Sequence, residues 1–155
     1  MKRLSERQRD DGAFRTFEDL EVYKKAREFR KRMYAIARRL PDLEKYELGR
    51  QIRASVSLTN NIAEGHGRYH YLDEIKFELQ ARGSLAELVD DLNVCEDEQY
   101  LSPTDIADLK ERASEVQRLI NGYIRFLRNR KSEALLVVRE SAVEDELLDE
   151  LGDTF

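Results

Sequence analysis

Four stretches of this chain carry rows of apolar residues, three of them at steps of three and four, and this spacing restricts the fold more than any other feature. In the last stretch the two steps alternate without a miss from Ile106 to Leu127. Such a row places its members on one side of an α-helix, where they can bury against neighbouring helices. No stretch shows the two-residue alternation that is typical of a strand. The sequence therefore predicts an all-α fold with these rows: Val22, Ala26, Phe29, Met33, Ile36 and Leu40; Leu48, Ile52, Val56, Ile62 and Ala63; Phe77, Ala81, Leu85, Leu88, Leu92 and Cys95; Ile106, Leu109, Ala113, Val116, Ile120, Tyr123 and Leu127.

Residues that start or stop helices fall between these rows. Thr16 is a suitable N-cap, Pro41 ends the first helix, and Gly65 and Gly67 can supply the left-handed turn that stops the second. Ser102 followed by Pro103 is the clearest helix start in the chain. Because short connections leave no room for a crossover, four such helices form an antiparallel up-down four-helix bundle. The predicted helices cover roughly residues 17–40, 42–65, 71–99 and 103–130.

Composition divides the chain into three regions. Residues 1–15 alternate in charge and contain few apolar groups, which is typical of a charged N-terminal arm. Residues 16–130 hold the four rows and form the bundle. Residues 131–155 carry eight acidic side chains against Lys131 and Arg139. We interpret this acidic C-terminal tail as an extra helix docked on the bundle, an acidic helical peptide for a partner, or a disordered extension.

The apolar segments are too short to cross a bilayer, and the first residues lead into no apolar signal core. We therefore expect a cytoplasmic protein that has no membrane association. The single cysteine, Cys95, lies among apolar residues and fits a reduced, buried thiol.

The net charge of −5 hides a strong separation of charge along the chain. Residues 15–39 contain nine basic and four acidic groups, whereas residues 87–115 contain two basic and ten acidic groups. Basic side chains on a helix face can bind phosphate, although a charged face is often only solvated. The opposite charges could instead complement one another between subunits. The candidate nucleic-acid-binding residues are Lys24, Lys25, Arg27, Lys31, Arg32, Arg38 and Arg39.

Small polar residues in the second and third helices predict close helix packing or a subunit interface. Glycine and serine let a neighbouring backbone approach, and buried polar groups there must find hydrogen-bond partners. The candidate interface residues are Arg53, Asn60, Asn61, Glu64, Gly83 and Ser84.

The sequence contains only weak indications of a catalytic site or a metal site. His66, His70 and Glu74 have the spacing of metal ligands on one helix, but Gly65 and Gly67 interrupt the helix at that point. We find no paired catalytic carboxylates and no glycine-rich phosphate loop. The sequence thus predicts no catalytic residue, no metal and no cofactor, and the protein is not expected to be an enzyme.

Three motifs, in the same order, carry a resemblance to a known family. They are Phe17 to Tyr23 (FEDLEVY), Gln51 to Arg68 (QIRASVSLTNNIAEGHGR) and Ala81 to Leu88 (ARGSLAEL). Together they make roughly residues 17–128 similar to the 23S rRNA intervening-sequence protein family. The resemblance implies a helical bundle that assembles into a homopentameric ring. It also implies a relation to the accessory variability proteins of diversity-generating retroelements, which work beside a reverse transcriptase and its RNA.

Two functions follow from these observations. The first is a non-catalytic, oligomeric, nucleic-acid-binding accessory protein, with RNA or single-stranded DNA as ligand and a reverse transcriptase as partner. The alternative is a protein-interaction scaffold whose acidic tail recruits a partner without binding nucleic acid.

Overall fold

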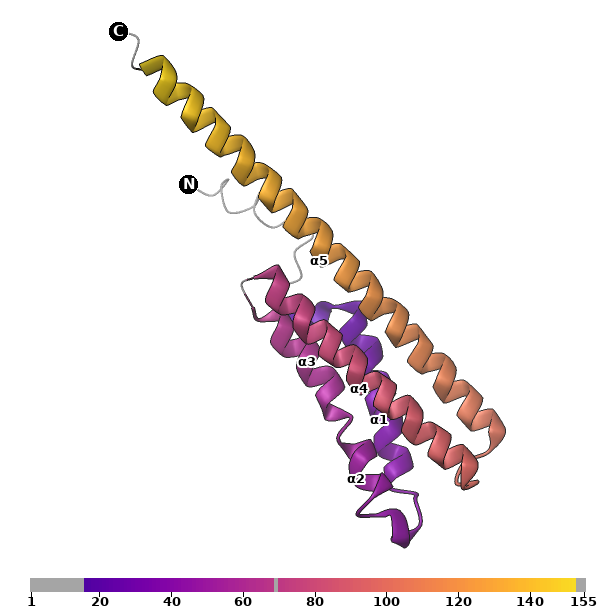
Figure 1. Ribbon diagram of the computed structural model, residues 1–155. Helices are drawn as coiled ribbons and strands as arrows, with labels where there is room; N and C mark the ends of the chain where they lie inside the picture. The colour runs from indigo at the N-terminus through magenta and orange to yellow at the C-terminus, as the bar shows by residue number, and fades with distance from the viewer. Residues whose placement is uncertain (1–15, 69, 153–155) are drawn as a thin grey trace, which may run out of the picture.

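The computed structural model describes residues 16–68 and 70–152, with side-chain environments up to residue 135. Within these residues the chain is helical and contains no strand. Four helical segments pack into a bundle (Figure 1). They are α1, the consecutive helices α2 and α3 taken together, α4, and α5. This arrangement confirms the predicted all-α helical bundle, while the subunit number stays a prediction and the arm at residues 1–15 lies outside the described residues. The helices are α1 (Glu21–Ala37), α2 (Leu48–Arg53), α3 (Val56–His66), α4 (Tyr71–Asp97) and α5 (Pro103–Gly152), with short 3-10 helices η2 (Phe17–Asp19) and η3 (Asp42–Glu44).

The predicted cap at Thr16 is confirmed, but it caps η2 and not the long helix. The Thr16 hydroxyl accepts from the Glu18 N–H at 3.2 Å, and the Asp19 carboxylate accepts from the Thr16 N–H at 3.1 Å. This reciprocal pair satisfies two N–H groups that a helix start leaves free. At its other end α1 stops at Ala37, before the predicted Leu40. Arg38 keeps helical angles, but the Arg39 N–H bonds to the Ile36 carbonyl three residues back at 2.8 Å, which tightens the chain into a turn before Leu40 and Pro41.

The prediction that the second helix is continuous is wrong. It begins with the 3-10 turn η3 and is broken between α2 and α3 at Ala54 and Ser55. There the N–H groups of Ser57 and Leu58 bond to carbonyls three residues back, each at 3.0 Å. Serine, threonine and asparagine have weak helix propensity, so the segment tolerates this tightening. The break also rotates the buried side: Val56, predicted to face inward, is exposed, whereas Leu58 is fully buried.

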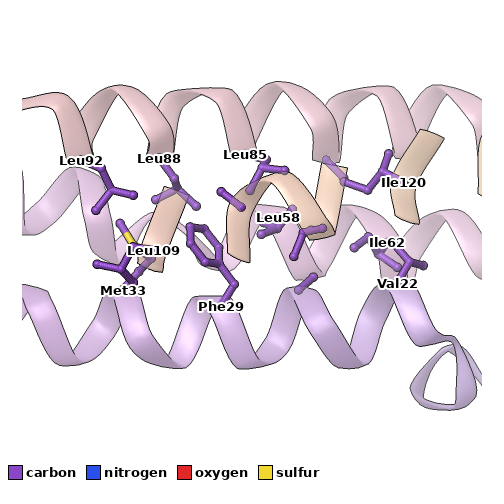
Figure 2. Packing of buried hydrophobic residues seen from close by; sticks show 14 of the residues in the cluster. Val22, Phe29, Met33, Leu58, Ile62, Leu85, Leu88, Leu92, Leu109 and Ile120 are labelled. Atoms are coloured by element: carbon purple, nitrogen blue, oxygen red, sulfur yellow. The ribbon is translucent and has the colours of Figure 1, made fainter. Parts of the chain in front are cut away.

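The core lies between α1, α3, α4 and α5. Figure 2 shows Phe29 and Met33 of α1 pointing toward leucines of α3 and α4. Of the predicted rows, those of α1, α4 and α5 are largely buried, and Cys95 is buried as expected. Burial of these side chains supplies the main stabilising term of the fold.

Helix α5 extends well beyond the predicted end of the fourth helix. It runs without a break from Pro103 to Gly152, and up to residue 135 the last of its buried core residues is Leu127. Figure 1 shows its C-terminal part continuing in line past the end of the bundle. The divisions at residues 15 and 130 stay predictions, since no break in secondary structure marks residue 130. No helix in the described part of the chain is both long and apolar enough to cross a membrane.

Candidate functional site

The basic residues of α1 divide between two sides of the helix. One side faces α5, where Lys25 lies 3.5 Å from Glu115 and Arg32 lies 3.9 Å from Asp108. Arg39 lies on this side too, beside a hollow of about 180 Å³ that Asp108 also lines. The charge complementarity that we expected between subunits therefore operates, for these residues, within one chain.

The other side of α1 carries Arg27, Lys31 and Arg38, which we call the basic face. All three side chains are exposed. Among the described residues, none of them has a carboxylate within 4.0 Å. The seventh predicted residue, Lys24, lies near this face but pairs with Glu21 at 3.2 Å. The structure thus separates cations that α5 partly neutralises from cations that face solvent.

A surface hollow of about 430 Å³ lies beside the basic face. It is lined by Lys31 and Arg38, by Arg30 and Tyr34 between them, and by Val56 of α3. The Arg30 guanidinium donates to the Thr59 hydroxyl at 2.6 Å, which fixes α1 against α3 at this point. The hollow therefore combines charged groups with the half-buried ring of Tyr34 on a braced pair of helices.

This geometry suits a phosphate-bearing chain. With a rise of about 1.5 Å per residue, Arg27 and Arg38 lie about 16 Å apart along α1. Cations spaced in this way can contact successive phosphates of one strand, and an aromatic ring beside them can stack on an unpaired base.

Four of the predicted interface residues lie on α2 and α3. Arg53, Asn60 and Glu64 are exposed, whereas Asn61 is half-buried and donates to the Ser57 carbonyl at 2.8 Å. Arg53 donates to the carbonyl of Lys45 at 3.1 Å, and Glu64 accepts from Arg68 at 2.6 Å. These local bonds hold the side chains in place, and their role in a subunit interface stays a prediction.

The structure places the predicted packing residues Gly83 and Ser84 differently within one chain, and their role at a subunit interface stays a prediction. The Ser84 hydroxyl is bonded to the Ser57 hydroxyl at 2.9 Å, which links α4 to α3. A Cβ atom at Gly83, however, would meet no atom within 4 Å, and Gly83 lines an open hollow of about 620 Å³ between α4 and α5.

Helices α3 and α4 approach closely at Gly65, which we had assigned with Gly67 to a left-handed helix stop; Gly67 is the C-cap of α3, but with right-handed angles. Gly65 lies inside α3, and a Cβ atom there would be 2.9 Å from Cβ of Phe77 on α4. The glycine is thus required by packing between helices, because any side chain would push α4 away.

A buried polar cluster between α3, α4 and α5 was missed by the sequence analysis. The Tyr123 hydroxyl donates to Glu74 at 2.5 Å, and His66 Nδ1 lies 3.7 Å from the same carboxylate. One turn along α4, Glu78 is fully buried at 0% exposure, and among the described residues neither of its carboxylate oxygens has a hydrogen-bond partner. Burial, aided by the charge of Glu74, raises the pKa of Glu78 to about 8. The sequence did contain an indication of this cluster. Glu74 and Glu78 lie seven and three residues before Ala81, so they fall on the buried side of the same helix.

The metal site that the sequence analysis disfavoured has no counterpart in the described residues. His70 is exposed, while His66 and Glu74 belong to the buried cluster. No group of three potential ligand side chains in residues 16–68 and 70–152 is arranged to hold a metal ion.

Comparison with known proteins identifies a family and a solved structure with a similar fold. The model of the family described as 23S rRNA-intervening sequence protein matches residues 18–122. No curated protein matches the chain. A solved structure from Bacteroides thetaiotaomicron, of unknown function and from the S23 ribosomal protein family, aligns with a TM-score of 0.62 and 21% identity. The alignment covers 67% of this chain and 95% of the other, and at this identity it shows a shared fold alone.

Proposed function

Because the chain belongs to the 23S rRNA-intervening sequence protein family, we propose that it is a non-catalytic accessory protein that binds RNA or single-stranded DNA. The family membership confirms the resemblance drawn from the three motifs. The observation that carries the proposal is the basic face, where Arg27, Lys31 and Arg38 are exposed and, in the part of the chain that the structure describes, have no carboxylate within 4.0 Å.

Electrostatics favour these three residues over the other cations of α1. A cation that is already paired must give up its carboxylate before it can bind a phosphate, so Lys25 and Arg32 gain less from binding. Each newly contacted phosphate also releases condensed counterions, which supplies sequence-independent affinity. The family's description refers to 23S rRNA, which supports RNA as the ligand.

The proposal extends to assembly and partners. We propose a homo-oligomer, with the pentamer implied by the resemblance, and a reverse transcriptase of a diversity-generating retroelement as the partner. Exposed polar residues such as Asn60 and Glu64 are available for contacts between subunits. Light scattering that gives the mass of a monomer at micromolar concentration would remove the assembly part.

Two matched triple variants of the full chain test the binding proposal. Arg27→Gln, Lys31→Gln and Arg38→Gln together should weaken binding to a single-stranded RNA of mixed sequence, measured by fluorescence anisotropy. The slope of log K against log salt should become shallower by about 2 if all three residues contact phosphate. The control combines Lys25→Gln, Arg32→Gln and Arg39→Gln, which removes the same charge from the α5 side of the same helix.

The control separates a specific face from general charge. We expect the control triple to keep most of the binding and of the salt dependence. Equal losses in both triples would show that only net charge matters. Absence of binding by the unmodified protein at low salt would reject the proposal.

A scaffold function is the second candidate, and the length of α5 favours it. Residues 131–152 continue α5 past the bundle, and the sequence there is rich in aspartate and glutamate. Such an acidic helix offers a surface to a basic partner. Two results together would favour this candidate. Neither the full chain nor the truncated one would bind RNA, and removal of residues 136–155 would abolish co-purification with the reverse transcriptase.

A further inference from the structure

The open hollow of about 620 Å³ between α4 and α5 has an apolar lining that reaches the surface. Leu79 is 37% exposed, Ala86 is exposed and Val89 is half-buried, and all three line the hollow. Gly83 leaves room between them, because no atom lies within 4 Å of the place where its Cβ would be. Exposed apolar side chains around a hollow between two helices are typical of a groove that receives a helix of a partner. We call this hollow the α4–α5 groove.

The charged side chains of the α4–α5 groove are basic. Arg82 and Lys110 line it, and no aspartate or glutamate of the described residues does. Lys110 is already paired with Glu96 at 2.7 Å, whereas Arg82 donates to the neutral side chain of Asn121 at 3.0 Å. Arg82 is exposed, and in the described part of the chain it has no carboxylate within 4.0 Å. The groove therefore favours a partner helix that combines an apolar row with acidic side chains.

The part of α5 that continues past the bundle has this combination in its sequence. Residues 136–152 are helical and contain six acidic side chains against Arg139. Their apolar residues include a row at steps of seven and four, which places its positions along one side of a helix. This row, which we call the distal row, consists of Leu136, Val143, Leu147 and Leu151.

The distal row lies on the opposite side of α5 from the core of its own bundle. Leu136 follows the buried Leu127 by nine residues, which is about two and a half turns of the helix. The helices that cover Leu127 therefore do not cover the distal row, and a second surface is needed to bury it.

The α4–α5 groove of the same chain is out of reach of the distal row. Gln117 is the last α5 residue that lines the groove, and Val143 follows it on the same unbroken helix after about 39 Å. Figure 1 shows this part of α5 continuing in line past the bundle and not folding back. A second copy of the chain has no such restriction.

The lengths of the two surfaces agree. The distal row from Val143 to Leu151 extends over about 12 Å of helix, and the groove from Leu79 to Val89 extends over about 15 Å of α4. Residues 1–15 suit the groove less well, because they contain more basic than acidic side chains and few apolar ones.

We propose that the acidic extension of α5 in one copy docks its distal row into the α4–α5 groove of a second copy. The contact buries apolar groups on both surfaces and gives Arg82 carboxylates to bind. Two copies can exchange extensions reciprocally, or each copy can donate its extension to the next around a ring. The inference rests on the proposed homo-oligomer and names a surface that holds it together, and it uses none of the residues of the basic face.

Two substitutions in the full chain disable opposite halves of this contact. Gly83→Glu fills the groove and repels the acidic extension, while the open space at Gly83 leaves the core undisturbed. Leu147→Glu disrupts the distal row and leaves the groove intact. We expect the unmodified protein to show the mass of an oligomer at micromolar concentration in light scattering, and each variant alone to show the mass of a monomer. Thermal melting by circular dichroism checks that both variants are folded.

A matched control and a mixture make the test specific. Gly122→Glu makes the same change at another glycine with open space that does not line the groove, and it should keep the mass of the unmodified protein. An equimolar mixture of Gly83→Glu and Leu147→Glu should regain the mass of two chains, because the intact extension of the first can enter the intact groove of the second.

The outcomes separate this contact from assembly in general. An unchanged oligomer mass in Gly83→Glu and Leu147→Glu would overturn the inference and leave the homo-oligomer standing, whereas a monomeric unmodified protein would remove both. Variants that stay monomeric when mixed would overturn the inference too, because they would show that the distal row and the groove do not contact each other. An equal loss of mass in Gly122→Glu would have the same consequence, since it would show a general effect of added charge.

Discussion

Glu78 makes the stability of this protein depend on pH in a direction that a surface carboxylate does not. Its side chain is fully buried, both oxygens lack hydrogen-bond partners, and its pKa rises from 4.5 to about 8. The folded state therefore keeps the carboxyl protonated at pH values where the unfolded chain has released the proton. Since the folded state binds more protons, the free energy of unfolding falls as pH rises from 4.5 to 8. This loss of stability is complete once the pH exceeds the pKa that Glu78 has in the folded state.

The size of this effect follows from the pKa difference. One pKa unit corresponds to about 1.4 kcal/mol, so the shift of Glu78 is equivalent to about 5 kcal/mol over the whole window. At pH 7 the part already lost is about 3 kcal/mol. Glu78→Gln places an uncharged side chain of similar size at the same position and removes this term. The variant should therefore gain roughly 3 kcal/mol relative to the unmodified protein between pH 4.5 and pH 7.

Urea denaturation followed by circular dichroism at several pH values measures this difference. Other buried groups, including Glu74 and Asp91, also titrate with raised pKa values, so the useful quantity is the difference between two proteins. Glu133→Gln, at an exposed position, should give a curve parallel to that of the unmodified protein. Parallel curves for Glu78→Gln would refute the reasoning, because they would show that Glu78 is as ionised in the folded state as in the unfolded one.

The other structural predictions are simpler to test by thermal melting. Gly65→Ala should destabilise the protein by roughly 1–3 kcal/mol, since its Cβ atom would lie 2.9 Å from Cβ of Phe77. Gly83→Ala adds the same methyl group to a helix position with open space, and should instead stabilise by about 0.5–1 kcal/mol. Removal of residues 136–155 should leave the cooperative transition intact, because Leu127 is the last buried residue in the part of the chain, up to residue 135, whose burial the structure describes; loss of cooperativity would place part of the core in the removed segment. The same truncation should change RNA affinity only modestly, since a continuous α5 carries the acidic residues away from the basic face.

Local sequence patterns were sufficient for the helical class of the fold and for most of the core, although not for the continuity of the second helix or the ends of the first and last. The cap at Thr16, the start at Pro103 and the buried rows of α1 and α5 depend on hydrogen bonds and side-chain spacing within a few residues of the chain. Such local terms can be read without knowing which helix packs against which. The family resemblance was carried by the same kind of short motif.

Contacts between helices were beyond the reach of the sequence. Which of the cations on α1 are paired depends on where α5 lies, and the spacing of Lys25 and Arg27 on α1 gives no sign that one faces Glu115 and the other faces solvent. The role of Gly65 likewise became clear only when Phe77 was placed beside it.

The sequence by itself determined an all-α chain with four apolar rows, because periodicity and helix caps are properties of neighbouring residues. The tertiary structure decided where the second helix breaks, which cations α5 neutralises, and which carboxylates are buried without a partner. These features depend on distances between residues that are far apart in the chain. Desolvation and ion pairing act through space, so their outcome is fixed only once the helices are packed.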